Sequence, residues 1–211
     1  MISNIVWEKS RTMIKTLKIF LILAVIITVF AVVSCGGNGS RRIVSDIPIK
    51  TDILGLKLCE ITEEQKIEET VSDAIDEYVI TDSQKQSYGK TIRVLPVSMD
   101  FLFGGFSWMY VDIDLNKEGR VAAIRLTSSY ENVESAQRQY DQVSALFKQK
   151  YGNGNLHPSN QLTFWTDNVN SVGVEYEQSS AINGNDRSFC VLYYVNIALA
   201  DSIEEANASD I

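Results

Sequence analysis

The chain has 211 residues, with 19 basic and 27 acidic side chains, one histidine and three cysteines. This length is enough for one domain with a substantial core. The formal net charge of −8 argues against a nucleic-acid partner, which would require a basic surface. No metal-type spacing of His or Cys is present, so we expect no metal site and no cofactor.

The N-terminal segment is typical of a secretory signal. An apolar run from Ile19 to Val33 follows a basic lead-in and precedes the small residue Ser34. This run is shorter than the roughly 20 residues that a membrane-spanning helix needs, although an uncleaved signal-anchor helix is the alternative. Translation starting at Met1 or at Met13 would give the same mature protein.

The string Val32-Val33-Ser34-Cys35 resembles the lipobox of bacterial lipoproteins. The resemblance implies that residues 1–34 are removed and that Cys35 becomes the lipid-bearing N-terminus, which attaches the protein to a membrane. The stretch Cys35-Gly36-Gly37-Asn38-Gly39-Ser40 looks like the tether of Bacteroidetes lipoproteins, and we expect a flexible tether over residues 35–46. Arg41 and Arg42 stand where surface-exposed members carry acids. This difference favours the periplasmic face of the outer membrane, within the cell envelope.

The first half of the remaining chain predicts a helix followed by three strands. Thr62 and Gln65 form a capping-box pattern, and apolar residues at helical spacing extend the predicted helix over 62–79. Residues 91–97 form a strand candidate. Residues 107–115 alternate between apolar and polar, a turn follows at 116–119, and residues 120–127 return, which predicts a β-hairpin.

The second half predicts the same order of elements. Asn132 is a good cap for a helix over 132–151. Three strand candidates follow, at 162–166, 171–177 and 188–196. The last is apolar on both faces, so we expect it in the centre of a sheet.

Together these elements predict an α+β fold over residues 47–200. We expect an antiparallel sheet of about six strands with two amphipathic helices on one face, and an acidic tail over 201–211. The order is also consistent with a degenerate tandem α-β-β-β repeat. This layout resembles small envelope lipoproteins and the tandem-repeat enzyme-inhibitor folds.

An aromatic segment is the first candidate binding site. Phe101, Phe103, Phe106 and Trp108 surround two adjacent glycines, as in a contact loop for a partner. Core packing at a strand entry is the alternative, because aromatic residues also dominate cores.

The patterns of the other candidate residues do not support metal binding or catalysis. Asp112, Asp114 and Asn116 open like a calcium loop, but the later positions of that motif do not match, so we expect a solvated strand face. His157 is expected in an exposed loop, without a catalytic role. No catalytic residue is predicted.

Three further residues concern covalent chemistry. Cys59 and Cys190 could form a disulfide or remain separate buried thiols. The tripeptide at Ser202 resembles the O-glycosylation sequon of Bacteroidetes secreted proteins.

These observations predict a membrane-anchored envelope lipoprotein that is not an enzyme and that serves in binding or assembly, with an envelope protein as its partner. Three alternatives stay open. They are an enzyme inhibitor or immunity-like protein, a small-ligand or lipid carrier with an apolar cavity, and a hydrolase with an unrecognised site.

Overall fold

The computed structural model describes residues 42–75, 77–86, 89–97, 100–157, 159, 161–179 and 187–201. The chain divides into two compact units, Met1–Arg42 and Ile43–Ile211, and the second is described below. The predicted signal, Cys35 and Ser202 lie outside the described residues. Within the described residues, none of the helices combines the length and apolar character that crossing a bilayer requires.

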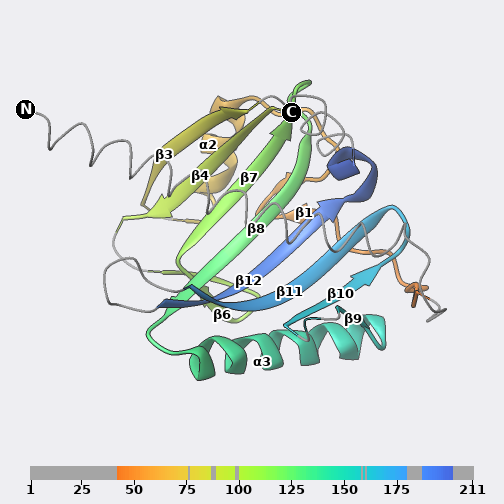
Figure 1. Cartoon of the computed structure of the whole chain (residues 1–211). Helices are drawn as coiled ribbons and strands as arrows, with labels where there is room; N and C mark the ends of the chain where they lie inside the picture. Colours follow the sequence, from red (N-terminus) through yellow and green to blue (C-terminus); the bar gives the residue numbers. More distant parts are fainter. Residues whose placement is uncertain are drawn as a thin grey trace, which may run out of the picture. The chain divides into compact units, whose positions relative to one another are not determined.

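The domain is built on one antiparallel sheet of eight strands (Figure 1). The strands, in spatial order, are β3 (Tyr78–Gln86), β4 (Gly89–Pro96), β7 (Tyr110–Asn116), β8 (Val121–Tyr130), β12 (Arg187–Asn196), β11 (Asn170–Ser179), β10 (Leu162–Thr166) and β9 (Asn155–Leu156). Within the described residues, the helices are α2 (Glu64–Ser72) and α3 (Val133–Tyr151), and residues 197–201 form a further helical turn directly after β12. Two small hairpins pair β1 (Asp52–Ile53) with β2 (Leu56–Lys57), and β5 (Phe101–Phe103) with β6 (Phe106–Trp108).

The α+β class and the antiparallel sheet are confirmed, but the predicted strand count of about six is too low. The two strands that the sequence did not indicate are β3 and β9, which form the two edges of the sheet. The expected central position of residues 188–196 is confirmed, because β12 pairs with β8 on one side and with β11 on the other.

The predicted helix over 62–79 is too long and its capping box is wrong. The helix occupies only Glu64–Ser72, and its N-cap residue is Glu63, which makes no side-chain cap bond. Thr62 is instead buried and extended, because its backbone N–H donates to Gly119 O at 2.9 Å and the preceding Ile61 forms a β-bridge with Arg120. Pairing with the β7–β8 turn therefore overrides the local capping pattern.

The second helix matches its prediction. Asn132 Oδ1 accepts a hydrogen bond from Ser135 N at 2.9 Å, which satisfies one free N–H of the first turn. The helix ends where Gly152 adopts a φ of +82°, a conformation that glycine tolerates best. Ala136, Tyr140 and Val143 form the buried stripe.

The chain order shows two similar halves. Each half is a helix followed by four consecutive strands of the large sheet: α2 with β3, β4, β7 and β8, then α3 with β9 to β12. The β5–β6 hairpin is inserted into the first half. The last strand of each half lies at the centre, where β8 pairs with β12. The repeat unit is thus α-β-β-β-β in topology, one strand longer than predicted.

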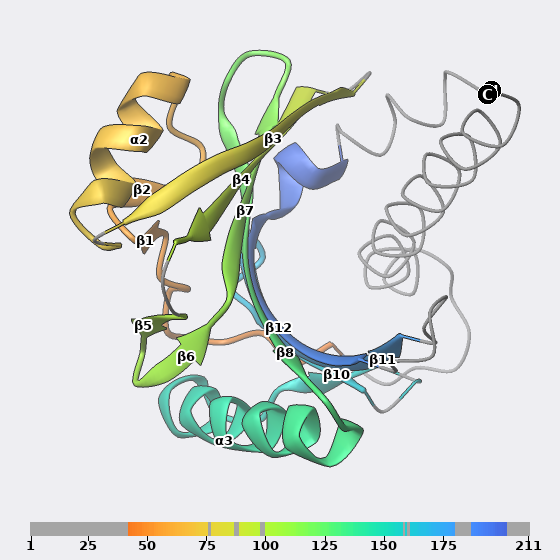
Figure 2. The same cartoon turned by 90° about the vertical axis from the view of Figure 1, so that its left-hand side faces the viewer.

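The sheet is strongly curved, and α2 and α3 both lie on its convex side (Figure 2). Side chains of both helices share one apolar core with the convex face of the strands, including Ile67, Val143, Ile113 and Leu192. β-bulges at Ile80/Asp82 and Asp114/Leu115 add to the bending. The opposite, concave face is covered by neither α2 nor α3.

Candidate binding face

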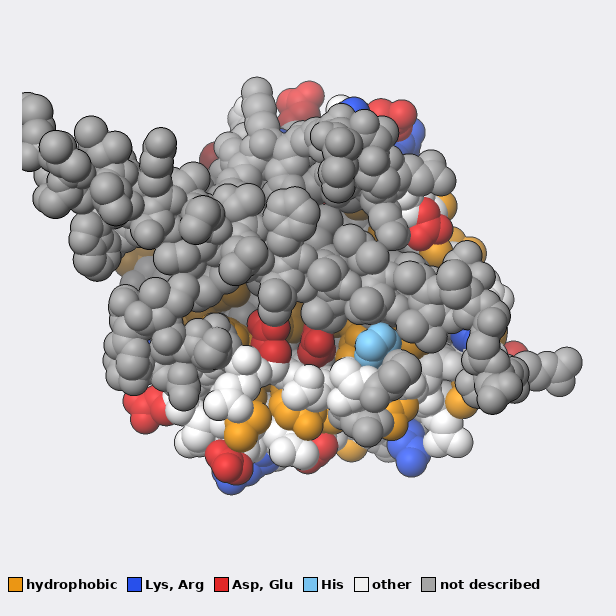
Figure 3. Space-filling model, viewed as in Figure 1, with side chains coloured by type: hydrophobic (Ala, Val, Ile, Leu, Met, Phe, Trp, Pro, Cys, Tyr) orange, Lys and Arg blue, Asp and Glu red, His pale blue; other side chains and the backbone are white. Residues whose placement is uncertain are grey.

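One row of side chains crosses the concave face. The register places Arg93 of β4 opposite Asp112, Asp112 opposite Arg125, and Arg125 opposite Tyr193. Beyond Tyr193 the row continues to Gly173 of β11 and Phe164 of β10. Because directly paired residues of antiparallel strands point to the same face, all six belong to one surface. Figure 3 looks onto this side of the molecule and shows acidic, polar and hydrophobic side chains together on its described part.

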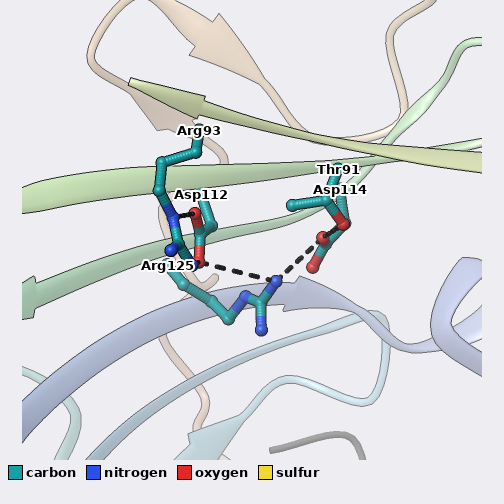
Figure 4. A network of polar contacts seen from close by, with 5 residues as sticks. All are labelled: Thr91, Arg93, Asp112, Asp114 and Arg125. Atoms are coloured by element: carbon teal, nitrogen blue, oxygen red, sulfur yellow. Dashed lines mark hydrogen bonds and ion pairs between the residues drawn. The ribbon is translucent and has the colours of Figure 1, made fainter. Parts of the chain in front are cut away.

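The first half of the row is a network of ion pairs (Figure 4). Arg93 donates from Nε and Nη2 to the two oxygens of Asp112, at 2.6 and 2.8 Å. Arg125 Nη2 donates to Asp114 Oδ1 at 2.9 Å and lies 3.9 Å from Asp112 Oδ2. Thr91 Oγ1 donates to Asp114 Oδ1 at 2.6 Å. Two carboxylates and two guanidinium groups are thus held on three adjacent strands.

This network corrects the expectation of a solvated strand face at Asp112 and Asp114. Both residues are buried, at 4% and 7% exposure. A buried carboxylate needs a charge partner and hydrogen bonds, and the arginines of the two neighbouring strands supply both. Calcium binding or glycosidic acid–base chemistry finds no support here, because the oxygens accept hydrogen bonds from Arg and Thr side chains.

Arg93 is also held from its other side. Its guanidinium lies 4.3 Å from the centroid of the Tyr110 ring, within the range of a cation–π contact. The hydrogen bond to Asp112 raises the pKa of Arg93. Burial raises the pKa of Tyr110. The Arg93 side chain still has 36% of its surface exposed, so it is the member of the network that a partner can reach.

The second half of the row contains buried polar groups without a partner among the described residues. Tyr193 OH and the neighbouring Ser171 Oγ are both in this state. The Tyr193 ring covers Gly173, where a Cβ would overlap it. Burial raises the pKa of the Tyr193 hydroxyl well above its usual range. Unpaired buried groups of this kind are uncommon in folded proteins.

Glu175 lies on the same face of β11. Burial, with a smaller contribution from the charge of Glu177, raises the pKa of Glu175 to about 8. At neutral pH this carboxyl therefore holds a proton and can donate a hydrogen bond. The sequence contained a signal for this cluster in the alternation of Ser171, Gly173 and Glu175, but it did not show which strands lie beside β11.

The aromatic segment forms the β5–β6 hairpin. Trp108 has 0% of its surface exposed and its Nε1 donates to Phe103 O at 3.0 Å. Phe101 is also buried, and Phe103 and Phe106 are half-buried against the core. The hairpin exposes the paired residues Leu102 and Ser107, and Leu102 is the apolar one, at 75% exposure.

The remaining candidate residues lie apart from this row. Cys59 and Cys190 are free thiols rather than a disulfide, and burial raises the pKa of Cys190. His157 is half-buried, and its Nδ1 lies 3.0 Å from Ser159 Oγ. Within the described part of the chain, no three His, Cys, Asp or Glu side chains are grouped to hold a metal ion.

No protein-family model, curated protein or solved structure matches the chain.

Proposed function

We propose that the chain is a lipid-anchored protein of the bacterial cell envelope whose domain binds a partner protein and performs no catalysis. Cys35 carries the lipids and holds the domain at the outer membrane on its periplasmic side. The concave face of the sheet is the contact surface. The lipobox string supports the anchor, and the curvature and polar row of the sheet support the contact surface.

The observation that carries the binding role is an ion-pair network with one accessible member. The concave face bears fixed charges, in the Arg93–Asp112 and Arg125–Asp114 pairs, and the Arg93 side chain is 36% exposed. Side chains held in place by strand register lose little freedom when a partner binds, which favours specific recognition.

The alternatives receive less support. A carrier would need an apolar cavity between sheet and helices, and apolar side chains of one core cluster pack into that space. A hydrolase would need an activated nucleophile or a free acid–base pair, whereas Asp112 and Asp114 are both bound by arginines. An enzyme inhibitor remains a second candidate, because the β5–β6 hairpin exposes Leu102 in the middle of β5.

Site-specific photo-crosslinking tests the contact surface. A benzophenone amino acid replaces Phe189, which is half-buried on the concave face of β12, in the full-length protein in its native envelope. The matched control carries the same group at Gln142, which is exposed on α3. We expect a discrete protein adduct from position 189 and none from position 142. Adducts from position 142 alone would contradict the proposed surface.

The anchor has a separate test. Cys35→Ala should release the protein from membranes and block lipoprotein-type processing, because the thiol is the group that is alkylated. Cys59→Ala, in the half-buried free thiol of the domain, should leave both unchanged. Unchanged membrane retention and processing of the Cys35→Ala protein would contradict the anchor.

A further inference from the structure

Exposed apolar side chains gather where the chain enters the domain. Ile43, Val44, Ile47, Leu156 and Val169, here called the entry patch, are each between 41% and 60% exposed. Single exposed apolar residues are ordinary on protein surfaces, but a group of them marks a contact with a membrane or a partner. The entry patch combines the first residues of the domain with Leu156 of the edge strand β9 and Val169 of the turn between β10 and β11.

Hydrogen bonds hold residues 43–49 against β9 and the end of β10. Ile43 N donates to Asn155 Oδ1, and Asn155 Nδ2 donates to Ile43 O, both at 2.7 Å. Ser45 N donates to Thr166 O at 2.8 Å, and Ile49 N donates to Asp167 Oδ2 at 2.8 Å. Leu156 follows Asn155 directly, and Val169 lies in the turn that Asp167 begins.

Basic side chains flank the entry patch. Lys148 and Lys150 occupy the last turn of α3 and are exposed, as is Lys50, whose backbone N–H donates to Tyr151 OH at 3.3 Å. Two acids also lie at the patch. Asp167 accepts backbone hydrogen bonds from Ile49, Val169 and Asn170, and Asp46, between Val44 and Ile47, is exposed. The three lysines outnumber these two carboxylates, so this surface is less acidic than the chain as a whole, which suits a lipid headgroup region.

The distance to the proposed anchor is short. Ile43 lies eight residue steps after Cys35, with seven residues between them. A fully extended chain of this length spans at most about 28 Å, at roughly 3.5 Å per residue. If Cys35 carries the lipids, the entry patch can never be far from the bilayer, and the tether raises its effective concentration there.

We propose that the entry patch rests on the bilayer as a second membrane contact, which orients the domain on the membrane. The inference relies on the proposed lipid anchor at Cys35. Ile43, Val44, Ile47, Leu156 and Val169 insert at the level of the headgroups, and Lys50, Lys148 and Lys150 lie against the phosphates. The concave face and the β5–β6 hairpin remain available to a partner.

Lipid photo-crosslinking tests the contact in the lipidated full-length mature protein, purified and reconstituted into vesicles of phosphatidylethanolamine and phosphatidylglycerol. A benzophenone amino acid replaces Leu156 in one protein and Leu102 in its control, because both are exposed leucines. We expect a mass increase of one phospholipid at position 156 and none at position 102. Val169→Asp should reduce the adduct at position 156, whereas Val97→Asp, at a valine of similar exposure outside the patch, should not.

Three outcomes would overturn the membrane contact: no lipid adduct at position 156, equal adducts at both positions, or a covalent dimer at 156, which would assign the patch to a second copy of the chain. Thermal unfolding of each variant verifies that it is folded. The mass of the N-terminal peptide reports acylation of Cys35 independently. An acylated Cys35 without an adduct at 156 contradicts the second contact alone, and an unmodified Cys35 contradicts the anchor and the contact together.

Discussion

Arg93 and Asp112 form a bidentate ion pair between neighbouring strands, with nitrogen-to-oxygen distances of 2.6 and 2.8 Å. The planar guanidinium matches the carboxylate in this geometry, which is the strongest form of protein ion pair. The pair lies in the first half of the sheet, where β4 meets β7. The pair therefore supports the register of β4 against β7, and it holds the Arg93 guanidinium in place on the concave face.

Replacing Asp112 with Asn should destabilise the domain by about 3 kcal/mol, near the lower end for a broken buried pair because Arg93 keeps some contact with water. The substitution keeps the shape of the side chain and removes its charge, which leaves Arg93 and Arg125 without their shared partner. Urea unfolding measures the change.

The matched control is Glu118→Gln, which removes a carboxylate that pairs with Arg120 on the surface. This pair should contribute less than about 1 kcal/mol. Equal effects of the two substitutions would show that burial of the Asp112 network adds nothing to stability.

The raised pKa of Glu175, about 8, predicts a specific pH dependence. The folded state binds this proton more tightly than the unfolded chain, in which a glutamate titrates near 4.5. Stability should therefore be greatest at acidic pH, fall as the pH rises between about 4.5 and 8, and level off above. Glu175→Gln should remove this fall and stabilise the protein at alkaline pH.

Urea unfolding at about pH 5 and about pH 9 measures this effect as the difference in unfolding free energy. Glu131→Gln, at an exposed residue before α3, provides the control and should preserve the fall. A fall of the same size in the Glu175→Gln protein would assign the pH dependence to other groups.

Two substitutions in the β5–β6 hairpin should differ strongly in their effect on stability. Trp108→Ala removes a fully buried ring and should cost about 3–5 kcal/mol of stability. Leu102→Asp changes an exposed side chain and should alter stability by less than about 0.5 kcal/mol. Thermal unfolding compares them. A large loss of stability for Leu102→Asp would mean that the Leu102 side chain is packed against the domain and not exposed to solvent.

Gly173→Ala should destabilise the domain by about 1–3 kcal/mol, because the added Cβ would overlap the Tyr193 ring. The loss should largely disappear when Tyr193 is also replaced by Leu, since the smaller side chain leaves room. A double-mutant cycle in urea measures the coupling between the two positions. Additive effects would show that Tyr193 does not pack over Gly173.

The elements that sequence patterns predicted well are those decided by local chemistry. The β7–β8 hairpin has an alternating sequence in β7 and a turn at Gly119, and α3 has both a side-chain cap and a buried stripe. The strand β3 was missed because Ile75 and Tyr78 continue the helical spacing of α2, while the second half of the strand is polar. With only two residues, β9 carries no periodic signal.

The concave row could not be predicted for a different reason. Asp112 and Asp114 alternate with apolar residues, which in isolation indicates a face open to water. Their burial depends on Arg93 and Arg125, whose positions beside them follow from strand register and not from spacing along the chain. The pairing of β8 with β12, more than fifty residues apart, is likewise set by the fold as a whole.

The central position of β12 has a consequence for how the protein is made. This strand comes last in the chain, yet it joins the two four-stranded halves of the sheet. During synthesis from the N-terminus, the first half can form its β3-β4-β7-β8 meander early, whereas the unpaired edge of β8 must wait for residues 187–196. Until these residues emerge, β8 presents a free strand edge that can pair with other chains. The large sheet can therefore be completed only after residues 187–196 are available to pair with β8.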